Sequence, residues 1–249
     1  MIHIRNSQEI KLLRKSAQIV AMALQMIESR IQPGVTTGEL NMVIEDFILS
    51  HNARPAFKGF HGYPASSCIS IDDQVVHGIP GNRKLQNGEL VSIDIGVELD
   101  GYFGDAAKTF PVGQVSAEKK RLMQVTQESL YIGIEAAREG NRLSDIGYAI
   151  QSYVEAAGFS VVRDLVGHGI GQEMHEDPQI PNYGDPHQGP RLKPGMVFAI
   201  EPMVNMGKYE VRTLADEWTV VTVDGLPSAH FEHDIVISSH KAEILSAGN

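Results

Sequence analysis

An internal duplication is the feature that most constrains the fold of this 249-residue chain. Matching stretches recur at an offset of 106 or 107 residues: 34–48 with 140–154, His61-Gly62 with His168-Gly169, and Gly88-x-Leu90-x-x-Ile93-Asp94 with Gly195-x-Val197-x-x-Ile200-Glu201. Two copies are too few for a solenoid. We therefore expect an α+β fold with pseudo-twofold symmetry, in which two helix pairs pack on a curved, mainly antiparallel sheet. One domain should cover residues 1–249, with its copies at approximately 7–112 and 117–237.

Apolar residues spaced by three and four predict the helices of each copy. In the first copy they predict a helix over about residues 7–31, which ends before Pro33-Gly34. A second helix should begin after Thr36 and run to about residue 52, because Thr36 and Glu39 have the spacing of a capping box.

A β-hairpin is predicted around Asp100-Gly101, a dipeptide that suits a two-residue turn. Pairing outward from this turn places Gly96 opposite Asp105, so that Asp94 and Asp105 become diagonal neighbours on one face. Two solvent-facing aspartates on a half-exposed sheet are the alternative. The apolar run around Asp94 favours burial, and buried carboxylates require metals, hydrogen-bond donors or protons.

The composition excludes several classes of partner. A formal net charge of −10 opposes contact with a phosphate backbone, so nucleic acid is not expected as a substrate. Cys68 is the sole cysteine, which rules out an intrachain disulfide and suits a reducing compartment. No segment approaches the roughly 20 apolar residues of a membrane span. We expect a cytoplasmic protein that does not contact a membrane.

Further side chains suited to chemistry lie in the second copy. His168 is flanked by glycines, which permit close approach of a ligand, and Glu201 follows an apolar strand. Glu232 stands beside two histidines, where an edge strand would leave it solvated. Together with Asp94 and Asp105 these residues form a hard, oxygen-rich set that favours Mn²⁺, Fe²⁺, Co²⁺ or Zn²⁺. Four acids match two divalent ions, and paired metals serve metal-assisted hydrolysis.

Six motifs, taken in their order and spacing, resemble those of type I methionine aminopeptidases, which have the pita-bread fold. The motifs are Val76-His77-Gly78-Ile79-Pro80, Asp94 with Asp105, Gly167-His168-Gly169-Ile170-Gly171, His175, Glu201-Pro202-Met203 and Glu232. The resemblance extends over nearly the whole chain. It implies a single catalytic domain that removes the initiator methionine from nascent proteins whose second residue is small.

The resemblance also implies how the ligand set is divided. Asp94 would bind one divalent ion, Asp105 and Glu232 would bridge two ions, and His168 and Glu201 would bind the second. The nucleophile would be a metal-bridging water or hydroxide, with Glu201 as the proton shuttle. The native metal, whether Co, Mn, Fe or Zn, is left open by the sequence.

Two histidines outside the metal site gain roles from the same resemblance. His175 would hydrogen-bond the scissile carbonyl or its tetrahedral oxyanion, a contact that strengthens as charge develops. His77 would contact the peptide beyond the scissile bond and assist the leaving nitrogen. Judged from the residues alone, a loop histidine is the preferred interpretation of His77 and a surface histidine that of His175.

A methionine pocket is implied by an apolar and aromatic set suited to a thioether. Its members are Phe57, Phe60, Tyr63, Cys68, Met174 and Trp218. Core packing explains such residues equally well. The family commonly has phenylalanine at the place of Met174, which leaves the shape of the pocket open. Cys68 is expected to be a pocket wall rather than a nucleophile, because the hydrolysis needs no thiolate.

Two other functions fit parts of the same pattern. An Xaa-Pro aminopeptidase or prolidase of the same fold shares the five metal ligands, although His77-Gly78-Ile79-Pro80 argues against it. A peptide-binding protein without enzymatic activity is the alternative from a different class, and such relatives usually lose metal ligands. Here all five are present.

The expected partner is the N-terminal methionine of nascent polypeptides, acted on by a monomer. Transient contact with the ribosome suits such a substrate. The basic run Lys119-Lys120-Arg121 is the one patch that could serve it, and a run of this kind is usually a solvated helix face.

Overall fold

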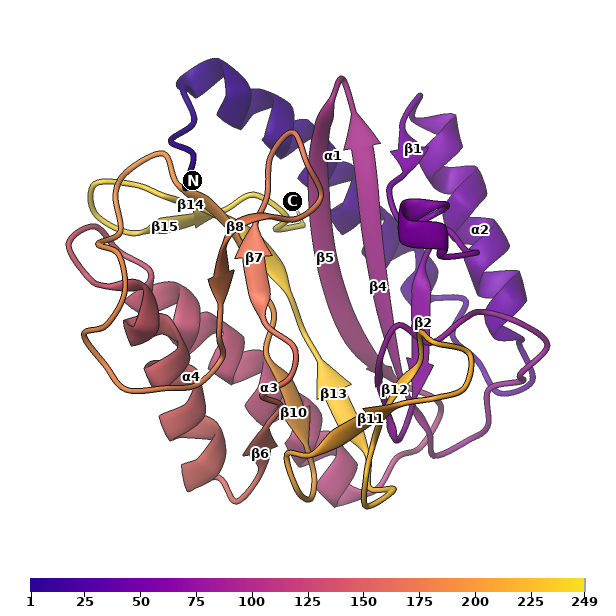
Figure 1. The fold of residues 1–249 in the computed structure, drawn as a ribbon. Helices are drawn as coiled ribbons and strands as arrows, with labels where there is room; N and C mark the ends of the chain where they lie inside the picture. Colours follow the sequence, from indigo (N-terminus) through magenta and orange to yellow (C-terminus); the bar gives the residue numbers. More distant parts are fainter. Residues whose placement is uncertain (249) are drawn as a thin grey trace.

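In the computed structural model, which describes residues 1–248, the chain forms helices on either side of a central group of strands (Figure 1). The helices are α1 (Ser7–Glu28), α2 (Thr37–Ser50), the 3-10 helix η1 (Phe60–Gly62), α3 (Ala117–Ala136) and α4 (Leu143–Ala156). The strands are β1 (Arg54–Pro55), β2 (Cys68–Ile71), β3 (Gln74–Val76), β4 (Leu90–Leu99), β5 (Tyr102–Pro111), β6 (Ser160–Val161), β7 (Gly167–Gly169), β8 (Glu176–Ile180), β9 (Val197–Ile200), β10 (Met203–Asn205), β11 (Val211–Thr213), β12 (Val220–Thr222), β13 (Ser228–His230), β14 (His233–Ile237) and β15 (Ala242–Ile244).

Every strand pair of the described chain is antiparallel, which confirms the predicted fold class. The expected sheet is divided into four hydrogen-bonded sheets, because many strands are only two to four residues long. They are β1-β4-β2 with β5 beside β4, β13-β10-β6, β11-β12-β3, and β15-β14-β9-β7-β8.

The β4–β5 hairpin has the predicted register. Leu99 pairs with Tyr102 across the turn, and Gly96 pairs with Asp105 farther along the ladder. Asp100 and Gly101 both have positive φ, 54° and 80°, as a two-residue hairpin turn with this twist requires. A local turn therefore fixes where the carboxylates of this hairpin lie.

Each helix pair covers its own part of the strands. Helix α1 packs against β4 and β5, and α2 packs against α1 and β1; Ile27, Ile44 and Ile93 belong to one apolar cluster there. Helix α3 packs against β13 and β9, and α4 packs against α3, β6 and β8; Leu130 and Phe198 belong to the cluster of this half. Figure 1 shows α2 on the right of the strands and α4 on the left, with α1 passing behind β5 and β4.

The two halves repeat the same local contacts. The N–H of Gly34 donates to the carbonyl of Leu85 (2.8 Å), and the N–H of Gly140 donates to that of Leu192 (3.2 Å). Both glycines have positive φ, at which a side chain would be strained. Isolated bridges also correspond, Thr36 with Lys84 and Arg142 with Arg191.

Helix boundaries differ slightly from those predicted. Helix α1 ends at Glu28 instead of near residue 31, because the chain turns away so that Gly34 can bond Leu85. Helix α2 ends at Ser50, and its predicted capping box between Thr36 and Glu39 is present. None of the helices in residues 1–248 has the length and apolarity to cross a membrane.

Candidate active site

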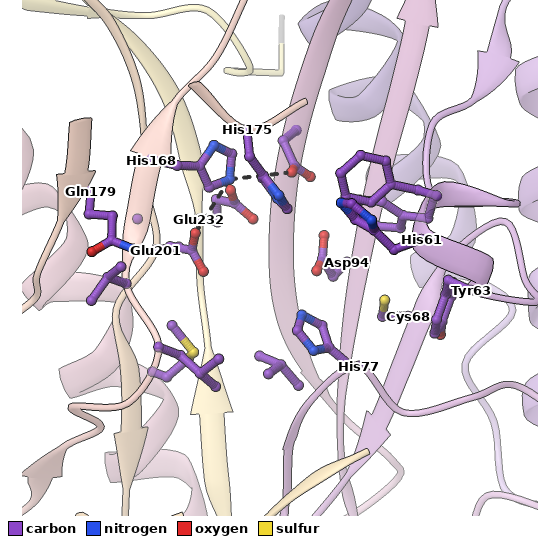
Figure 2. A pocket seen from close by; sticks show the side chains of 18 of the residues that line it. His61, Tyr63, Cys68, His77, Asp94, His168, His175, Gln179, Glu201 and Glu232 are labelled. Atoms are coloured by element: carbon purple, nitrogen blue, oxygen red, sulfur yellow. Dashed lines mark ion pairs between the residues drawn. The ribbon is translucent and has the colours of Figure 1, made fainter. Parts of the chain in front are cut away.

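A cavity of about 490 Å³ lies between the two halves of the molecule (Figure 2). The residues predicted to bind metal or to act in catalysis all line it: His77, Asp94 and Asp105 from the first half, and His168, His175, Glu201 and Glu232 from the second. Residues separated by up to 155 positions in sequence are thus collected around one space.

Strand β5 brings Asp105 and Glu232 together by pairing with the segment 230–234. The N–H of Glu232 donates to the carbonyl of Ala107 (2.9 Å), and the N–H of Asp105 donates to Oδ2 of Asp234 (2.7 Å). On the other edge of β5, Ala107 is aligned with Asp94. Aligned residues of antiparallel neighbours share a face, so Asp94 and Glu232 flank Asp105 on one side of the sheet.

The carboxylates are withdrawn from water. Asp105 is 3% exposed and Glu232 is 2% exposed, which shows that the alternative of a solvated Glu232 was wrong. Asp94 and Glu201 are half-buried. Burial raises the pKa of Asp94 to about 7, and it raises the pKa of Asp105 and of Glu232 well above the ordinary range, with mutual repulsion adding to burial.

His168 faces these carboxylates with one ring nitrogen. Its Nε2 lies 3.5 Å from Oε1 of Glu201 and 4.0 Å from Oδ2 of Asp105. Its Nδ1 lies 3.0 Å from the carbonyl oxygen of Gly169, which can only accept a hydrogen bond. The proton therefore belongs on Nδ1, which leaves the lone pair of Nε2 directed at the acidic cluster. Burial lowers the pKa of His168 to about 3, so the ring is neutral.

This arrangement fits a divalent cation. Asp105, His168 and Glu232 offer ligand atoms that all lie within 4.8 Å of one another. Three buried oxygens, Asp94 Oδ1, Asp105 Oδ1 and Glu232 Oε1, have no hydrogen-bond partner among the described residues. Neighbouring buried carboxylates without partners are costly unless protons or cations compensate them. The donor set of oxygens and one imidazole suits the divalent transition metals.

The two remaining predicted histidines, His77 and His175, also line the cavity. The ring of His175 makes edge contacts with His168 (centroids 4.3 Å apart) and Phe60 (5.2 Å). His77 has a positive φ of 59° and lies 6.5 Å from Trp218, centroid to centroid. Burial lowers the pKa of both histidines, that of His77 to about 4, so both are neutral at pH 7. Neutral rings can donate one hydrogen bond to a substrate.

All six residues predicted for the methionine pocket belong to one apolar cluster beside the acidic group. Phe57, Tyr63, Cys68 and Met174 are buried, and Phe60 and Trp218 pack against them. Tyr63 stacks edge-on against Trp218, with centroids 5.1 Å apart, and its hydroxyl donates to the carbonyl of Gly78 (2.9 Å).

Cys68 joins this cluster to the acidic group. It pairs with Asp94 in the β2–β4 ladder and lines the cavity. Burial, followed by the nearby Asp94 carboxylate, raises the pKa of the thiol well above its ordinary value. The thiol therefore stays protonated, as expected of a wall residue.

Three further residues at the site were not predicted. His61 lines the cavity in a left-handed conformation, and its match to His168 in the duplication was a signal for it. His230 is buried behind the site, with Nε2 3.8 Å from Oε2 of Glu201. Asp234 is 1% exposed and bonds the backbone of Asp105. His230 and Asp234 each lie two residues from Glu232, and residues spaced by two share a face of a strand; this was the one sequence signal for them.

Comparison with known proteins gives consistent matches over nearly the whole chain. The model of metallopeptidase family M24 matches residues 11–239. Methionine aminopeptidase 1 of Bacillus subtilis is 53% identical over 246 residues, which are 99% of each chain. The crystal structure of methionine aminopeptidase from Rickettsia prowazekii has a TM-score of 0.98 and 45% identity, and the match covers 99% of this chain and 100% of that one.

A more distant solved structure shares the fold. The prolidase from Pyrococcus horikoshii has a TM-score of 0.80 at 22% identity, and the match covers 99% of this chain but 64% of the prolidase. At that identity the likeness extends to the arrangement of helices and strands.

Proposed function

The chain belongs to metallopeptidase family M24 and, within it, to the methionine aminopeptidases, and from this premise we propose that it removes the initiator methionine from nascent proteins whose second residue is small. The observation that carries the proposal is the position of the acidic group. A buried set of carboxylates with one neutral imidazole lies directly beside a space whose apolar and aromatic lining suits a methionine side chain.

Five side chains are proposed to hold two divalent ions. Asp94 would bind one ion and His168 and Glu201 the other, while Asp105 and Glu232 are shared. The unpartnered oxygens of Asp94, Asp105 and Glu232 support this assignment. When bound, such ions supply Lewis-acid chemistry, which polarises a carbonyl and lowers the pKa of water. Membership of a metallopeptidase family implies a metal ion. The assay below ranks Co²⁺, Mn²⁺, Fe²⁺ and Zn²⁺ by the methionine release that each supports.

The protein side chains orient the substrate and move protons. The carboxylate of Glu201, whose pKa burial raises, is suited to accept a proton at one oxygen and return it to the leaving amine. His175 is proposed to donate a hydrogen bond to the scissile carbonyl oxygen, where negative charge develops. His77 would contact the peptide beyond the scissile bond.

The methionine side chain is proposed to occupy the space lined by Phe57, Phe60, Tyr63, Cys68 and Trp218. Sulfur–aromatic contacts there favour a thioether. The proposed metal site lies directly beside this space, so a first residue whose side chain fills the space presents its amino group and carbonyl to that site. Together the two features select a chain end that begins with methionine.

Further proposals concern the setting of the reaction. We propose that residues 1–249 form one catalytic domain built from two copies, that the protein acts in the cytoplasm as a monomer, and that it contacts the ribosome transiently. The nascent-chain substrate supports the last of these. The acidic net charge makes that contact a local one, because an extended RNA surface would repel the protein.

The deciding experiment measures methionine release from Met-Ala-Ser by metal-stripped protein, with each of the four ions added back separately. Ala-Pro-Ser serves as the control substrate. We expect metal-dependent release of methionine and no cleavage of the proline peptide. Replacing Asp105 or Glu232 with alanine should abolish turnover, and a fully active variant would refute the assignment of these ligands.

The same assay separates the alternatives. Cleavage of Ala-Pro-Ser in place of Met-Ala-Ser would move the protein to the Xaa-Pro peptidases. Tight peptide binding without cleavage under any divalent metal would favour a binding protein that kept the fold.

A further inference from the structure

The segment between β7 and β8, residues 170–175, carries His175, which the proposed function uses, and Met174, which was predicted for the methionine pocket. Met174 packs in the apolar cluster beside the cavity, behind its lining residues, and His175 extends into the cavity (Figure 2). This β7–β8 loop has no regular secondary structure of its own. Its conformation must therefore be set by contacts from elsewhere.

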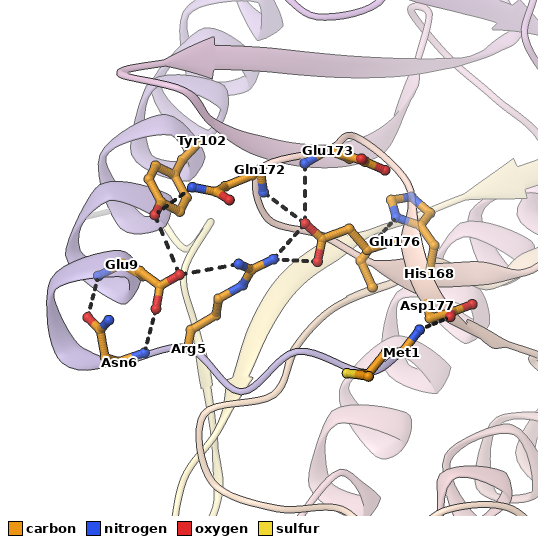
Figure 3. Close-up of polar contacts among 11 residues, drawn as sticks. Met1, Arg5, Asn6, Glu9, Tyr102, His168, Gln172, Glu173, Glu176 and Asp177 are labelled. Atoms are coloured by element: carbon orange, nitrogen blue, oxygen red, sulfur yellow. Dashed lines mark hydrogen bonds and ion pairs between the residues drawn. The ribbon is translucent and has the colours of Figure 1, made fainter.

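Backbone hydrogen bonds to Val197 and Phe103 hold the first residues of the loop, and the carboxylate of Glu176, directly after His175, holds the middle of it. Its Oε1 accepts hydrogen bonds from the backbone N–H groups of Gln172 (2.8 Å) and Glu173 (3.2 Å). The loop is thereby folded back onto its own last residue. Figure 3 shows this carboxylate directed at the N-terminal segment of the chain, whereas Figure 2 shows the His175 ring in the cavity.

The guanidinium of Arg5 completes the arrangement. Its Nη2 donates to both oxygens of Glu176, at 2.6 Å for Oε1, and its Nη1 donates to Oε1 of Glu9 at 3.2 Å (Figure 3). The side chains of Arg5 and Glu176 are only 6% and 8% exposed. A Cβ on Gly171 would lie 2.0 Å from Nη2 of Arg5, so the loop backbone itself rests against the guanidinium.

Arg5 is in turn held by elements outside the loop. Its N–H donates to the carbonyl of Gly195 (2.7 Å), and Glu9 belongs to the capping box at the start of α1. The pair therefore joins the N-terminal segment to the loop. Removing Arg5 would leave the buried Glu176 carboxylate without its counter-ion, and removing the charge of Glu176 would leave Arg5 with the longer contact to Glu9 alone. Losing one partner of a buried ion pair is costly and displaces neighbouring backbone.

We propose that Arg5 is a positioning residue, which acts through Glu176 to place His175 and Met174 and so to shape the methionine pocket. The inference rests on the proposed function. It assigns to the N-terminal segment a role in selecting the substrate, although that segment does not line the cavity.

Steady-state kinetics of the metal-loaded, full-length protein test this role. The substrates are Met-Ala-Ser and norleucyl-Ala-Ser, in which a methylene group replaces the sulfur. The variants are Arg5→Ala, Arg5→Lys, Glu176→Gln and the double variant Arg5→Ala with Glu176→Gln. Arg14→Ala is the matched control. Arg14 belongs to the same N-terminal region and forms an ion pair with Glu243 (2.9 Å), but both of these side chains are substantially exposed.

We expect Arg5→Ala and Glu176→Gln each to lower kcat/KM for Met-Ala-Ser at least tenfold and to reduce the preference for methionine over norleucine at least threefold. Metal content should stay at the parent level. The double variant should be no worse than either single variant, because the two residues act as a unit. Arg5→Lys keeps the positive charge but not the planar guanidinium that binds both carboxylate oxygens, so its kcat/KM should lie between that of Arg5→Ala and that of the parent. Arg14→Ala should match the parent.

Each contrary result has a separate meaning. Folded Arg5→Ala and Glu176→Gln proteins with the parent's kcat/KM and methionine preference would overturn the inference. So would losses that add in the double variant while the preference stays unchanged, since these indicate a merely structural effect. If Arg5→Ala does not fold, Arg5→Lys and Glu176→Gln decide by the same criterion. A parent protein that releases no methionine would instead overturn the proposed function.

Discussion

The Nε2 atom of His230 lies 3.8 Å from Oε2 of Glu201, while Nε2 of His168 faces Oε1 of the same carboxylate at 3.5 Å. Glu201 thus has an imidazole beside each of its oxygens. Burial lowers the pKa of both histidines to about 3, so both rings are neutral. His168 is a proposed metal ligand. The 3.8 Å separation is too long for a hydrogen bond, and Nε2 of His230 has no other partner within residues 1–248, so a small approach on metal binding would let His230 orient the other oxygen of Glu201.

Replacing His230 with leucine should therefore weaken metal binding by about 10-fold to 100-fold, the usual cost of losing a group that orients a ligand. His230→Gln retains an N–H donor and should stay within a few-fold of the parent. Calorimetric titration of metal-stripped protein with Mn²⁺ measures both. His233→Leu is the matched control, because His233 bonds Oγ of Ser246 at 2.8 Å on the other side of Glu232. Parental affinity in His230→Leu would contradict this account.

Asp105→Asn should have opposite effects on binding and on stability. The substitution keeps the shape of the side chain but removes a buried charge that neighbouring Glu232 repels. We expect it to abolish Mn²⁺ binding and, at pH 8, to raise the free energy of unfolding of the metal-free protein by about 1 kcal/mol or more. Urea denaturation in the presence of a chelator measures the second effect. Asp46→Asn, at an exposed position of α2, should change neither quantity.

The sequence predicted the hairpin register and both of its carboxylates because these depend on local rules. The turn at Asp100-Gly101 sets the pairing, and period-two alternation then sets which residues share a face. The burial of Glu232 was not predictable in this way. It depends on the bond between Glu232 and Ala107, which joins residues 125 positions apart across the two halves.

Arg5 was missed for a related reason. One arginine near the start of a chain has no motif, and its partner Glu176 is 171 residues away. Conversely, the six residues predicted for the methionine pocket were chosen through the resemblance, since their apolar character alone would equally suit a core. The structure places them in one apolar cluster, of which all but Met174 line the cavity.

The stability of the metal-free protein should fall as the pH rises from 6.5 to 9. A carboxyl with a raised pKa, such as Asp94 at about 7 or Asp105 well above its ordinary 3.8, contributes stability at low pH that is lost as the pH rises through the folded-state value. Histidines with lowered pKa, such as His77 and His168, act in the opposite sense, but only below their ordinary value of 6.5. Above pH 6.5 the carboxyls therefore determine whether the free energy of unfolding rises or falls with pH.

Urea denaturation with a chelator across this interval measures the slope, which should approach about 1.4 kcal/mol per pH unit for each carboxyl that stays protonated in the folded protein while it is ionised in the unfolded chain. Adding Mn²⁺ should remove the decline, because the cation stabilises the charged carboxylates. Asp105→Asn should make it shallower. A stability that stays level or increases between pH 6.5 and 9 without metal would show that these carboxyls are not protonated in the folded state.

Gly96 lies against two residues of the proposed methionine pocket, because a Cβ at this position would lie 2.6 Å from Cε1 of Phe57 and 2.8 Å from Cε of Met174. Gly96→Ala should push these side chains into the cavity. We expect kcat/KM for Met-Ala-Ser to fall about tenfold or more and the free energy of unfolding to fall by about 1–3 kcal/mol, as overpacking usually costs. Adding Met174→Ala should restore space and recover part of the kcat/KM. Gly81→Ala is the control, since a Cβ there meets nothing within 4 Å. If Gly96→Ala binds and cleaves methionine substrates like the parent, Phe57 and Met174 do not form the wall of the pocket.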